Sequence, residues 1–419
     1  MVVWESDASA GSDTSSTSIQ MQRLDADGSP IGGEVQVNDF TLGSQLHPSV
    51  HIDSAGRSIV TWVSTRSATP SNDIVIHARR YAADGAPIEE SFQVSTELAV
   101  VEDRPKVASD REGNLVVVWE DCDCLLSASL APALGQESDR RMLARRFDST
   151  TAPLGPPFSV NSYTTGAQLH GDVVMNANGE FVVTWMSFGS FGTDSHSSSI
   201  QVRRFDSNGV PGGDELQVNT YTTESQTSPV AARDAEGRLI VAWTNFVSGT
   251  PEAPPGIRVR RFDAAGEPLG DEFQVNVRTS GRQSRVAVAA GEVGFLVLWE
   301  SLGSSSADDS EWGIQGRYFG ADGVPLGGDF QINSFTTGNQ VGPAVAMDDS
   351  GNILAVWSDT ETDGDRAGIR ARLFRPVFLD GFESGSTQRW SRVVAPSSGE
   401  GQVAFGDSQQ QSPVPGRED

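Results

Sequence analysis

The sequence has little cysteine and almost no lysine. Cysteine occurs only at Cys122 and Cys124, so no disulfide framework holds the fold. Lysine occurs once, at Lys106, and a net charge of −26 leaves no basic face for phosphates, which excludes nucleic acid as a partner. No apolar run approaches the ~20 residues that span a bilayer. No signal peptide opens the chain, which starts inside a repeat, and we expect the true N-terminus to lie upstream.

Long segments with the 3.6-residue apolar period of a helix are also absent. Short β-branched and aromatic runs take their place, and seven of them end in tryptophan. Successive tryptophans are 58, 57, 66, 58, 56 and 58 residues apart. The seven are Trp4, Trp62, Trp119, Trp185, Trp243, Trp299 and Trp357. Self-similarity at a fixed period of this length is typical of a repeat fold.

Each period contains four strand-like segments, which we name A to D. Strand B ends in the tryptophan, strand C resembles 200–205, strand D resembles 329–333 and strand A resembles 343–348. Glycine-containing turns join A to B and C to D, since Asp-Gly and Asn-Gly supply the positive φ of tight turns. Four short antiparallel strands in ~57 residues are typical of a propeller blade. The sequence therefore predicts an all-β protein, a β-propeller of seven four-stranded blades over 1–377.

The strand count predicts an incomplete first blade. Seven B and seven C segments are present, but only six clear A and six clear D segments. Residues 377–380 are a candidate for the last D strand. The missing A strand either precedes Met1 or is supplied by 401–407, whose Val403-Ala404 matches the A-strand text Val345-Ala346. The upstream origin is favoured, because 395–419 is rich in Ser, Gln, Pro and Gly and is predicted to be a disordered tail.

Two segments resemble known proteins. GGDFQINSFTTGNQVGPAVAMDDSGNILAVWS at 327–358, followed by GIRARLF at 368–374, resembles a repeat of large secreted bacterial proteins, often calcium-associated adhesins or exoproteins. Residues 378–394 contain Asp-Gly-Phe-Glu-Ser-Gly and Trp390, and are similar to a short C-terminal element of exported proteins of Gram-negative bacteria. The resemblance implies a secreted or cell-surface location in such a bacterium.

Two polar patterns recur in almost every repeat, which favours a structural role. An asparagine precedes a glutamine by seven residues, and we expect these amides to satisfy backbone groups between D and A. An arginine of strand C precedes an aromatic ring by two residues, on the same strand face, and we expect it to pack on aromatic surface between blades. The asparagines are Asn38, Asn161, Asn219, Asn276 and Asn333, and the arginines are Arg79, Arg145, Arg203, Arg260, Arg317 and Arg372.

No catalytic centre is evident from sequence. The histidines form no metal-ligand spacing and are predicted to be solvated; they are His47, His51, His77, His170 and His196. No nucleophile elbow, P-loop or dinucleotide fingerprint is present. The four tyrosines stand at repeat positions, which argues against a tyrosine nucleophile. We therefore expect no group of acid, base and nucleophile that departs from the repeat, and no hydrolase activity.

The loops between B and C vary while the other turns are alike. B–C and D–A loops share one face of a propeller, and a varied loop face on a uniform scaffold is where recognition usually occurs. The favoured hypothesis is a monomeric, non-enzymatic extracellular or cell-surface module for binding or adhesion, with a glycan or protein ligand. The alternative is a propeller glycoside hydrolase or polysaccharide lyase acting outside the cell.

One loop suggests a metal, and another contains the two thiols. The last B–C loop places Asp359, Glu361, Asp363 and Asp365 at alternate positions with a glycine between the last two, a pattern that predicts a calcium site, although a solvated acidic turn is the simpler alternative. Cys122-Asp-Cys124 allows a strained disulfide, a soft-metal site or two thiols with no role. No other cofactor is predicted.

Overall fold

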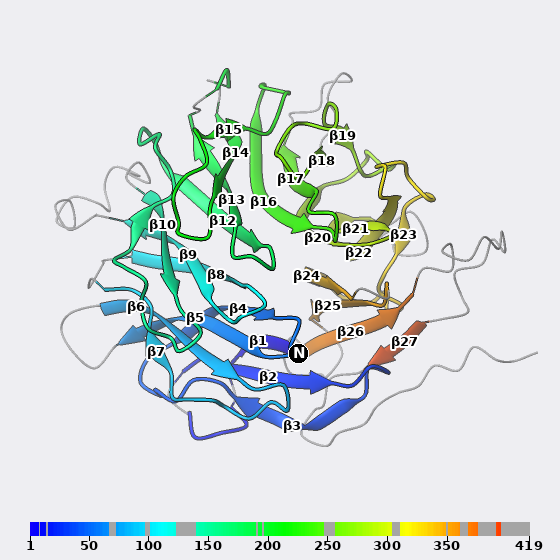
Figure 1. The fold of residues 1–419 in the computed structure, drawn as a ribbon. Helices are drawn as coiled ribbons and strands as arrows, with labels where there is room; N and C mark the ends of the chain where they lie inside the picture. The colour runs from blue at the N-terminus through cyan, green and yellow to red at the C-terminus, as the bar shows by residue number, and fades with distance from the viewer. Residues whose placement is uncertain are drawn as a thin grey trace, which may run out of the picture.

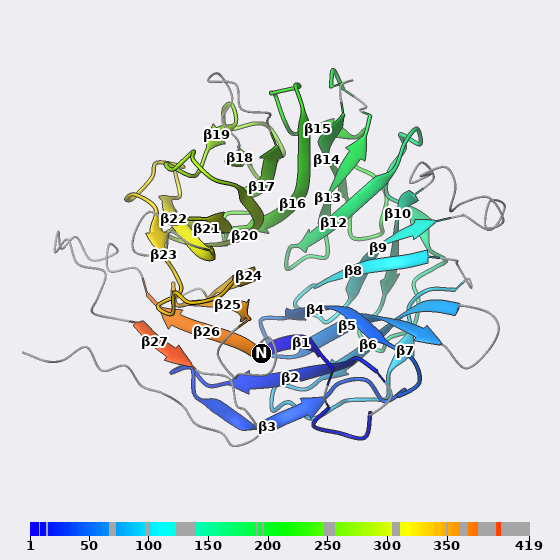
Figure 2. The same cartoon turned by 180° about the vertical axis from the view of Figure 1, so that it is seen from behind.

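The computed structural model describes residues 1–7, 9–13, 16–66, 73–96, 101–122, 140–189, 192–194, 197–246, 256–303, 311–348, 351–360, 368–375 and 391–394. These residues form seven antiparallel sheets arranged radially around an axis (Figure 1, Figure 2). Six sheets have four strands and one has three. The protein is therefore a seven-bladed β-propeller, as the sequence predicts. Within the described ranges no helix is long and apolar enough to cross a membrane.

The chain builds one blade after another. Blade 1 contains β1 (Val2–Ser6), β2 (Ser18–Leu24) and β3 (Pro30–Gln36); blade 2 contains β4 (Gln45–Ile52), β5 (Ser58–Arg66), β6 (Asp73–Tyr81) and β7 (Phe92–Gln93); blade 3 contains β8 (Val101–Ser109), β9 (Leu115–Cys122), β10 (Arg140–Phe147) and β11 (Phe158–Ser159); blade 4 contains β12 (Gln168–Met175), β13 (Phe181–Phe188), β14 (Ser198–Phe205) and β15 (Leu216–Gln217). Blade 5 contains β16 (Ser225–Arg233), β17 (Leu239–Phe246), β18 (Gly256–Phe262) and β19 (Phe273–Gln274); blade 6 contains β20 (Gln283–Gly291), β21 (Gly294–Leu302), β22 (Trp312–Gly320) and β23 (Phe330–Gln331); blade 7 contains β24 (Gln340–Met347), β25 (Ile353–Asp359), β26 (Gly368–Phe374) and β27 (Ser391–Val394).

The core lies between blades. In blade 4, β13 is buried on both faces except for its last residue, which explains its continuous apolar run. Val116 and Val118 of blade 3 pack in one cluster with Val183 and Trp185 of blade 4. Six of the seven repeat tryptophans are at most 2% exposed, and Trp4 is half-buried. Since a large buried aromatic contributes more apolar area than any other residue, the tryptophan of the B strand anchors each of blades 2 to 7 to the preceding blade.

Arginines of strand C link most blades to their neighbours. Arg203 Nη1 donates to the carbonyl of Val160 in the preceding blade at 2.9 Å, and Arg204 Nη1 donates to the carbonyl of Ala264 in the following blade at 2.9 Å. We call these two positions the backward and forward arginines. Backward arginines are Arg79, Arg145, Arg203, Arg260, Arg317 and Arg372, and forward arginines are Arg23, Arg80, Arg146, Arg204 and Arg261. A guanidinium offers five donors in a fixed fork, which explains why arginine rather than lysine supplies the positive charge.

The structural roles predicted for the repeated polar residues are confirmed. Arg203 lies over the ring of Phe205, with 5.7 Å between the guanidinium carbon and the ring centroid, and the same arrangement recurs at the other backward arginines. Asn219 Oδ1 accepts the backbone N–H of Ile200 at 2.8 Å, and its Nδ2 donates to the carbonyl of Tyr221. These amides therefore close the link between strands D and A.

The last blade differs from the prediction at its outer strand. The position beside β26 is occupied by β27, whose Val394 pairs with Ala371 and whose Ser391 pairs with Phe374. The sequence suggested 377–380 for this strand, and those residues lie outside the described ranges. A short strand with few distinctive side chains is recognised by its place in the sheet. The local sequence does not specify that place.

Candidate functional site

The inner strand of each of blades 2 to 7 contains a β-bulge at one repeat position. Two residues after the conserved glutamine (a glutamate in blade 3), the backbone turns to positive φ, between 46° and 66°. The six residues are His47, Arg104, His170, Ser228, Arg285 and Gly342, and we call them the inner ring. Five of the six are not glycine, although left-handed backbone costs an L-residue roughly 1–2 kcal/mol. Bulges re-aim side chains and are frequent beside functional sites.

The bulge repeats, but the side chains that it displays do not. A structural position would keep one residue type, as the asparagines and backward arginines do. The inner ring instead presents two imidazoles, two guanidinium groups, a hydroxyl and a glycine. A uniform scaffold with varied side chains indicates that this level of the propeller is where a ligand would be recognised.

Glutamates after the repeat tryptophan connect the inner ring across three blade boundaries. Glu120 Oε1 accepts the backbone N–H of His170 at 2.6 Å, and Glu300 Oε1 accepts that of Gly342 at 2.6 Å. Glu5 accepts the backbone N–H of His47 in the same way. Because these carboxylates bind the amide of a residue with positive φ, they hold the bulge of the next blade in place.

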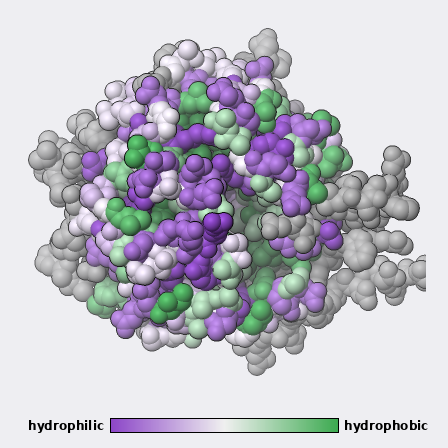
Figure 3. Space-filling view, in the orientation of Figure 1, coloured by the Kyte–Doolittle hydropathy of each residue, from purple (hydrophilic) through white to green (hydrophobic). Residues whose placement is uncertain are grey.

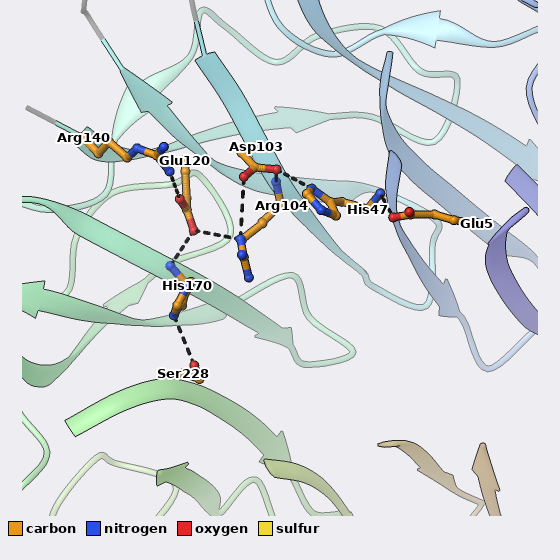
Figure 4. Close-up of polar contacts among 8 residues, drawn as sticks. All are labelled: Glu5, His47, Asp103, Arg104, Glu120, Arg140, His170 and Ser228. Atoms are coloured by element: carbon orange, nitrogen blue, oxygen red, sulfur yellow. Dashed lines mark hydrogen bonds and ion pairs between the residues drawn. The ribbon is translucent and has the colours of Figure 1, made fainter. Parts of the chain in front are cut away.

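A polar network extends from blade 1 across to blade 5 (Figure 4). Asp103 and Glu120 are directly opposite each other on β8 and β9. Nδ1 of His47, on β4, contacts Oδ1 of Asp103. Arg104 Nε lies 3.6 Å from Asp103 Oδ2 and 3.9 Å from Glu120 Oε1, so it bridges the two carboxylates. Arg140 donates to Glu120 Oε2 at 3.0 Å.

Asp103 and His47 stabilise each other's charged forms. The hydrogen bond that His47 donates to Asp103 raises the pKa of His47 above its ordinary value, against the opposing effect of burial. Burial alone would raise the pKa of Asp103, but the hydrogen bond and charge of His47 outweigh it and hold that pKa below its usual range. His47 has a side chain that is 42% exposed, so this pair is open to solvent.

Glu120 and His170 are moved toward their neutral forms. Burial raises the pKa of Glu120, whose side chain is 1% exposed, and the nearby guanidinium groups only partly oppose the shift. Burial, followed by the charge of Arg104, lowers the pKa of His170 to about 4. His170 Nδ1 lies 3.2 Å from Ser228 Oγ. The two carboxyl groups thus have opposed pKa shifts, and so do the two imidazoles. Opposed pKa shifts of neighbouring groups are frequent at functional sites.

The His47–Asp103 pair predicts a pH dependence of stability. A folded-state pKa of His47 above the unfolded value of about 6.5 stabilises the fold fully below pH 6.5, and this contribution is lost as pH rises through the folded value. We expect the free energy of unfolding in urea to fall less between pH 5.5 and 8.5 in His47→Gln than in the native protein. Equal changes in both proteins would contradict this.

Two exposed guanidinium groups stand in the inner ring. The Arg104 side chain is 49% exposed and the Arg285 side chain is 66% exposed, and the latter lies 3.4 Å from the buried Glu300. Strongly hydrophilic residues gather around the centre of one face (Figure 3). In a chain with a net charge of −26, these two cations are exposed, and each lies within 4.0 Å of a carboxylate.

The inner ring was missed from sequence, and the prediction that the histidines are solvated is wrong for two of them. The histidines are not simply solvated: His170 is half-buried, and His77 is buried with its ring stacked on Trp62. His47, Asp103 and Glu120 come together from β4, β8 and β9, and the expected absence of a catalytic group of acid, base and nucleophile stays a prediction. The available signal was the repeat alignment itself, in which this position varies while the glutamine two residues before it (a glutamate in blade 3) recurs. His196 lies outside the described residues.

The predicted calcium ligands are only partly described. Asp359 is fully buried, and its Oδ2 forms an ion pair with Arg370 Nε at 2.8 Å. Glu361, Asp363 and Asp365 lie outside the described residues, as does Cys124. Across the described ranges no group of three or more His, Cys, Asp or Glu side chains is placed to hold a metal ion. Calcium binding in this loop stays a prediction.

Isothermal titration tests the calcium prediction. We expect calcium to give a saturable heat with the native protein and a much weaker one with Asp363→Ala, because a calcium site needs 6–8 oxygen ligands. Flat titrations of both proteins would end the hypothesis.

Comparison with known proteins supports the fold. No family model and no curated protein matches the chain. Among solved structures, a protein of unknown function from Dyadobacter fermentans aligns with a TM-score of 0.52 and 11% identity, over 78% of this chain and 94% of that one. An α-L-arabinofuranosidase of family GH93 from Fusarium graminearum, solved with arabinobiose, aligns with a TM-score of 0.50 and 10% identity, over 79% and 93%. At such identities the likeness shows the fold alone.

Proposed function

We propose that the protein cleaves a polysaccharide outside the cell, as a glycoside hydrolase or a polysaccharide lyase acting at the inner ring. The observation that carries this proposal is the group of Asp103, His47, Glu120 and His170, in which neighbouring acids and bases are driven toward opposite protonation states. Acid–base cleavage needs a proton donor and a proton acceptor side by side at one pH.

The residues divide into donor, acceptor, orienting and holding roles. His170, whose neutral form is favoured by burial, accepts the proton of the attacking water in hydrolysis or of the sugar ring in elimination. His47 is the proton donor to the leaving oxygen, because its pKa is raised and its side chain is exposed. Asp103 orients the imidazole through Nδ1 and keeps it charged. Arg104 and Arg285 bind carboxylates of the sugar chain, since guanidinium groups pair with carboxylates through two parallel hydrogen bonds. Glu120 is a positioning residue, since it holds the backbone of His170.

The fold comparison makes sugar chains the first class of substrate to test. The arabinofuranosidase that shares the fold was solved with a disaccharide. A propeller built from short blades presents a broad face around its axis, where an extended polymer can lie across several inner strands.

A panel of acidic and neutral polysaccharides, assayed with and without calcium, tests the proposal. New reducing ends would indicate hydrolysis, and ultraviolet absorbance of unsaturated uronates would indicate elimination. We expect turnover of an acidic polymer. The absence of both turnover and binding across the panel would contradict the proposal.

A binding or adhesion module on the cell exterior is the second candidate. It is favoured by the exposure of His47, Arg104 and Arg285, three donors that would bind an acidic glycan without any acid–base step. Binding without turnover in the same panel would support this candidate over the first.

A further inference from the structure

The boundary between blades 7 and 1 is built differently from the other six. Among the described residues β1 pairs only with β2, so its inner edge has no partner strand, whereas every other B strand pairs on both sides. Figure 1 shows β1 and β26 near each other at this boundary. An unpaired strand edge favours the addition of a further strand.

The apolar faces at this boundary are less covered than their counterparts. Leu354 and Val356 of blade 7 are half-buried, while the equivalent Leu296 and Leu298 of blade 6 are fully buried. On the inner strands, Ala344 and Ala346 are exposed, while Ala287 and Ala289 at the same repeat positions are 9% and 7% exposed. On the other side of the boundary Trp4 is half-buried. The uncovered surface is therefore the surface that one more inner strand would cover.

The arginine links are also missing here. The backward position of blade 1 is Gln22, whose Nε2 donates to carbonyls of its own blade, at Arg23, Ile31 and Gly32. The forward position of blade 7 is Leu373. Within the described part of the chain, this is the boundary that has neither a backward nor a forward arginine. At this one boundary, the described residues thus include no arginine that links the two neighbouring blades.

We propose that residues 401–407 bind the inner edge of β1 as the fourth strand of blade 1 and so close the ring. β27 brings the chain back to blade 7 at Val394, beside the boundary with blade 1. This position favours 401–407 over an upstream segment as the source of the missing strand. Residues 395–400 span about 20 Å at about 3.3 Å per residue. Crossing the four strands of a blade takes about 15 Å at a spacing of about 4.8 Å.

The side chains of the segment fit this place. Gln402-Val-Ala-Phe-Gly-Asp407 places apolar residues at Val403 and Phe405, where the aligned inner strand of blade 7 has Val345 and Met347. In blade 7, Val345 pairs with Ala355 and Ala344 pairs with Val356, one residue before the tryptophan. Aligning Val403 with Val345 therefore places Gln402 opposite Val3 and Val403 opposite Val2.

This register is tested by a disulfide in the full-length chain. In a background with Cys122→Ser and Cys124→Ser, the pair Val3→Cys with Gln402→Cys is compared with Val3→Cys with Gln410→Cys. Residues directly opposite in a sheet have Cα atoms about 4.5–5.5 Å apart, within disulfide range. We expect the first pair to oxidise at least tenfold faster than the second, which measures chance encounters of the tail. Equal rates would overturn the proposal.

Deletion of 396–419 gives an independent measurement. We expect the melting temperature to fall by about 5 °C or more, since each kcal/mol shifts it by about 2–4 °C in a chain of more than 150 residues. An unchanged melting temperature would also overturn the proposal and would leave the inner edge of β1 to a strand from elsewhere.

Discussion

Replacing Asp103 with asparagine is expected to lower kcat/KM at neutral pH by about 100-fold or more on the polysaccharide that the panel identifies. The amide keeps the size of the side chain but loses the charge that raises the pKa of His47. Less of the imidazole is then protonated at neutral pH, so the proton donor is depleted. The alkaline limb of the rate profile should accordingly move to lower pH, which a merely structural role would not produce.

Thr227→Asn is the matched control. Thr227 occupies in β16 the repeat position that Asp103 occupies in β8, one residue before the inner ring, so the substitution places the same amide at the same level of another blade. We expect it to retain activity and an unshifted pH profile. Equal losses in both variants would show that Asp103 acts only through the fold.

Replacing Trp185 with alanine is expected to destabilise the protein by about 3–5 kcal/mol, as removal of large buried aromatics does. The side chain is fully buried between blades 3 and 4, and its indole N–H donates to Gln168 Oε1 at 2.9 Å. Both the apolar contacts and a buried hydrogen bond are lost. Unfolding in urea, followed by circular dichroism, measures the effect.

Trp312→Ala provides the comparison within the same protein. Trp312 is half-buried at the start of β22 and is not a repeat tryptophan. Its removal is expected to cost less than half as much. Similar losses for both variants would mean that the repeat tryptophans do not anchor the blades.

Much of the fold was predictable because each blade is a local unit. The tryptophan period gave the number of blades, and the regular asparagines and arginines were rightly assigned to the scaffold, since residues that recur in nearly every blade satisfy the same backbone groups each time. The outer strand of blade 7 was not predictable, because β27 is far from β26 in sequence and has no repeat signature.

The candidate site was not predicted from the sequence, because its residues come from different repeats. His47, Asp103 and His170 belong to three different blades, and each looks isolated in its own repeat. These residues come together only when the sheets pack around a common axis, because the same repeat position of every inner strand then lies at the same height along that axis. Comparing repeats position by position identifies the variable residue, but not the bulge that gives it a positive φ.

The sequence by itself determined the all-β class, the seven blades, the scaffold role of the repeated asparagines and arginines, and the incomplete first blade. These follow from contacts within a blade or between adjacent blades, which the repeat period encodes. The tertiary structure decided the inner ring, the opposed pKa shifts of Asp103 and Glu120, and the uncovered boundary between blades 7 and 1. These depend on distances between residues from separate repeats and on burial, and both arise only when the blades assemble around a common axis.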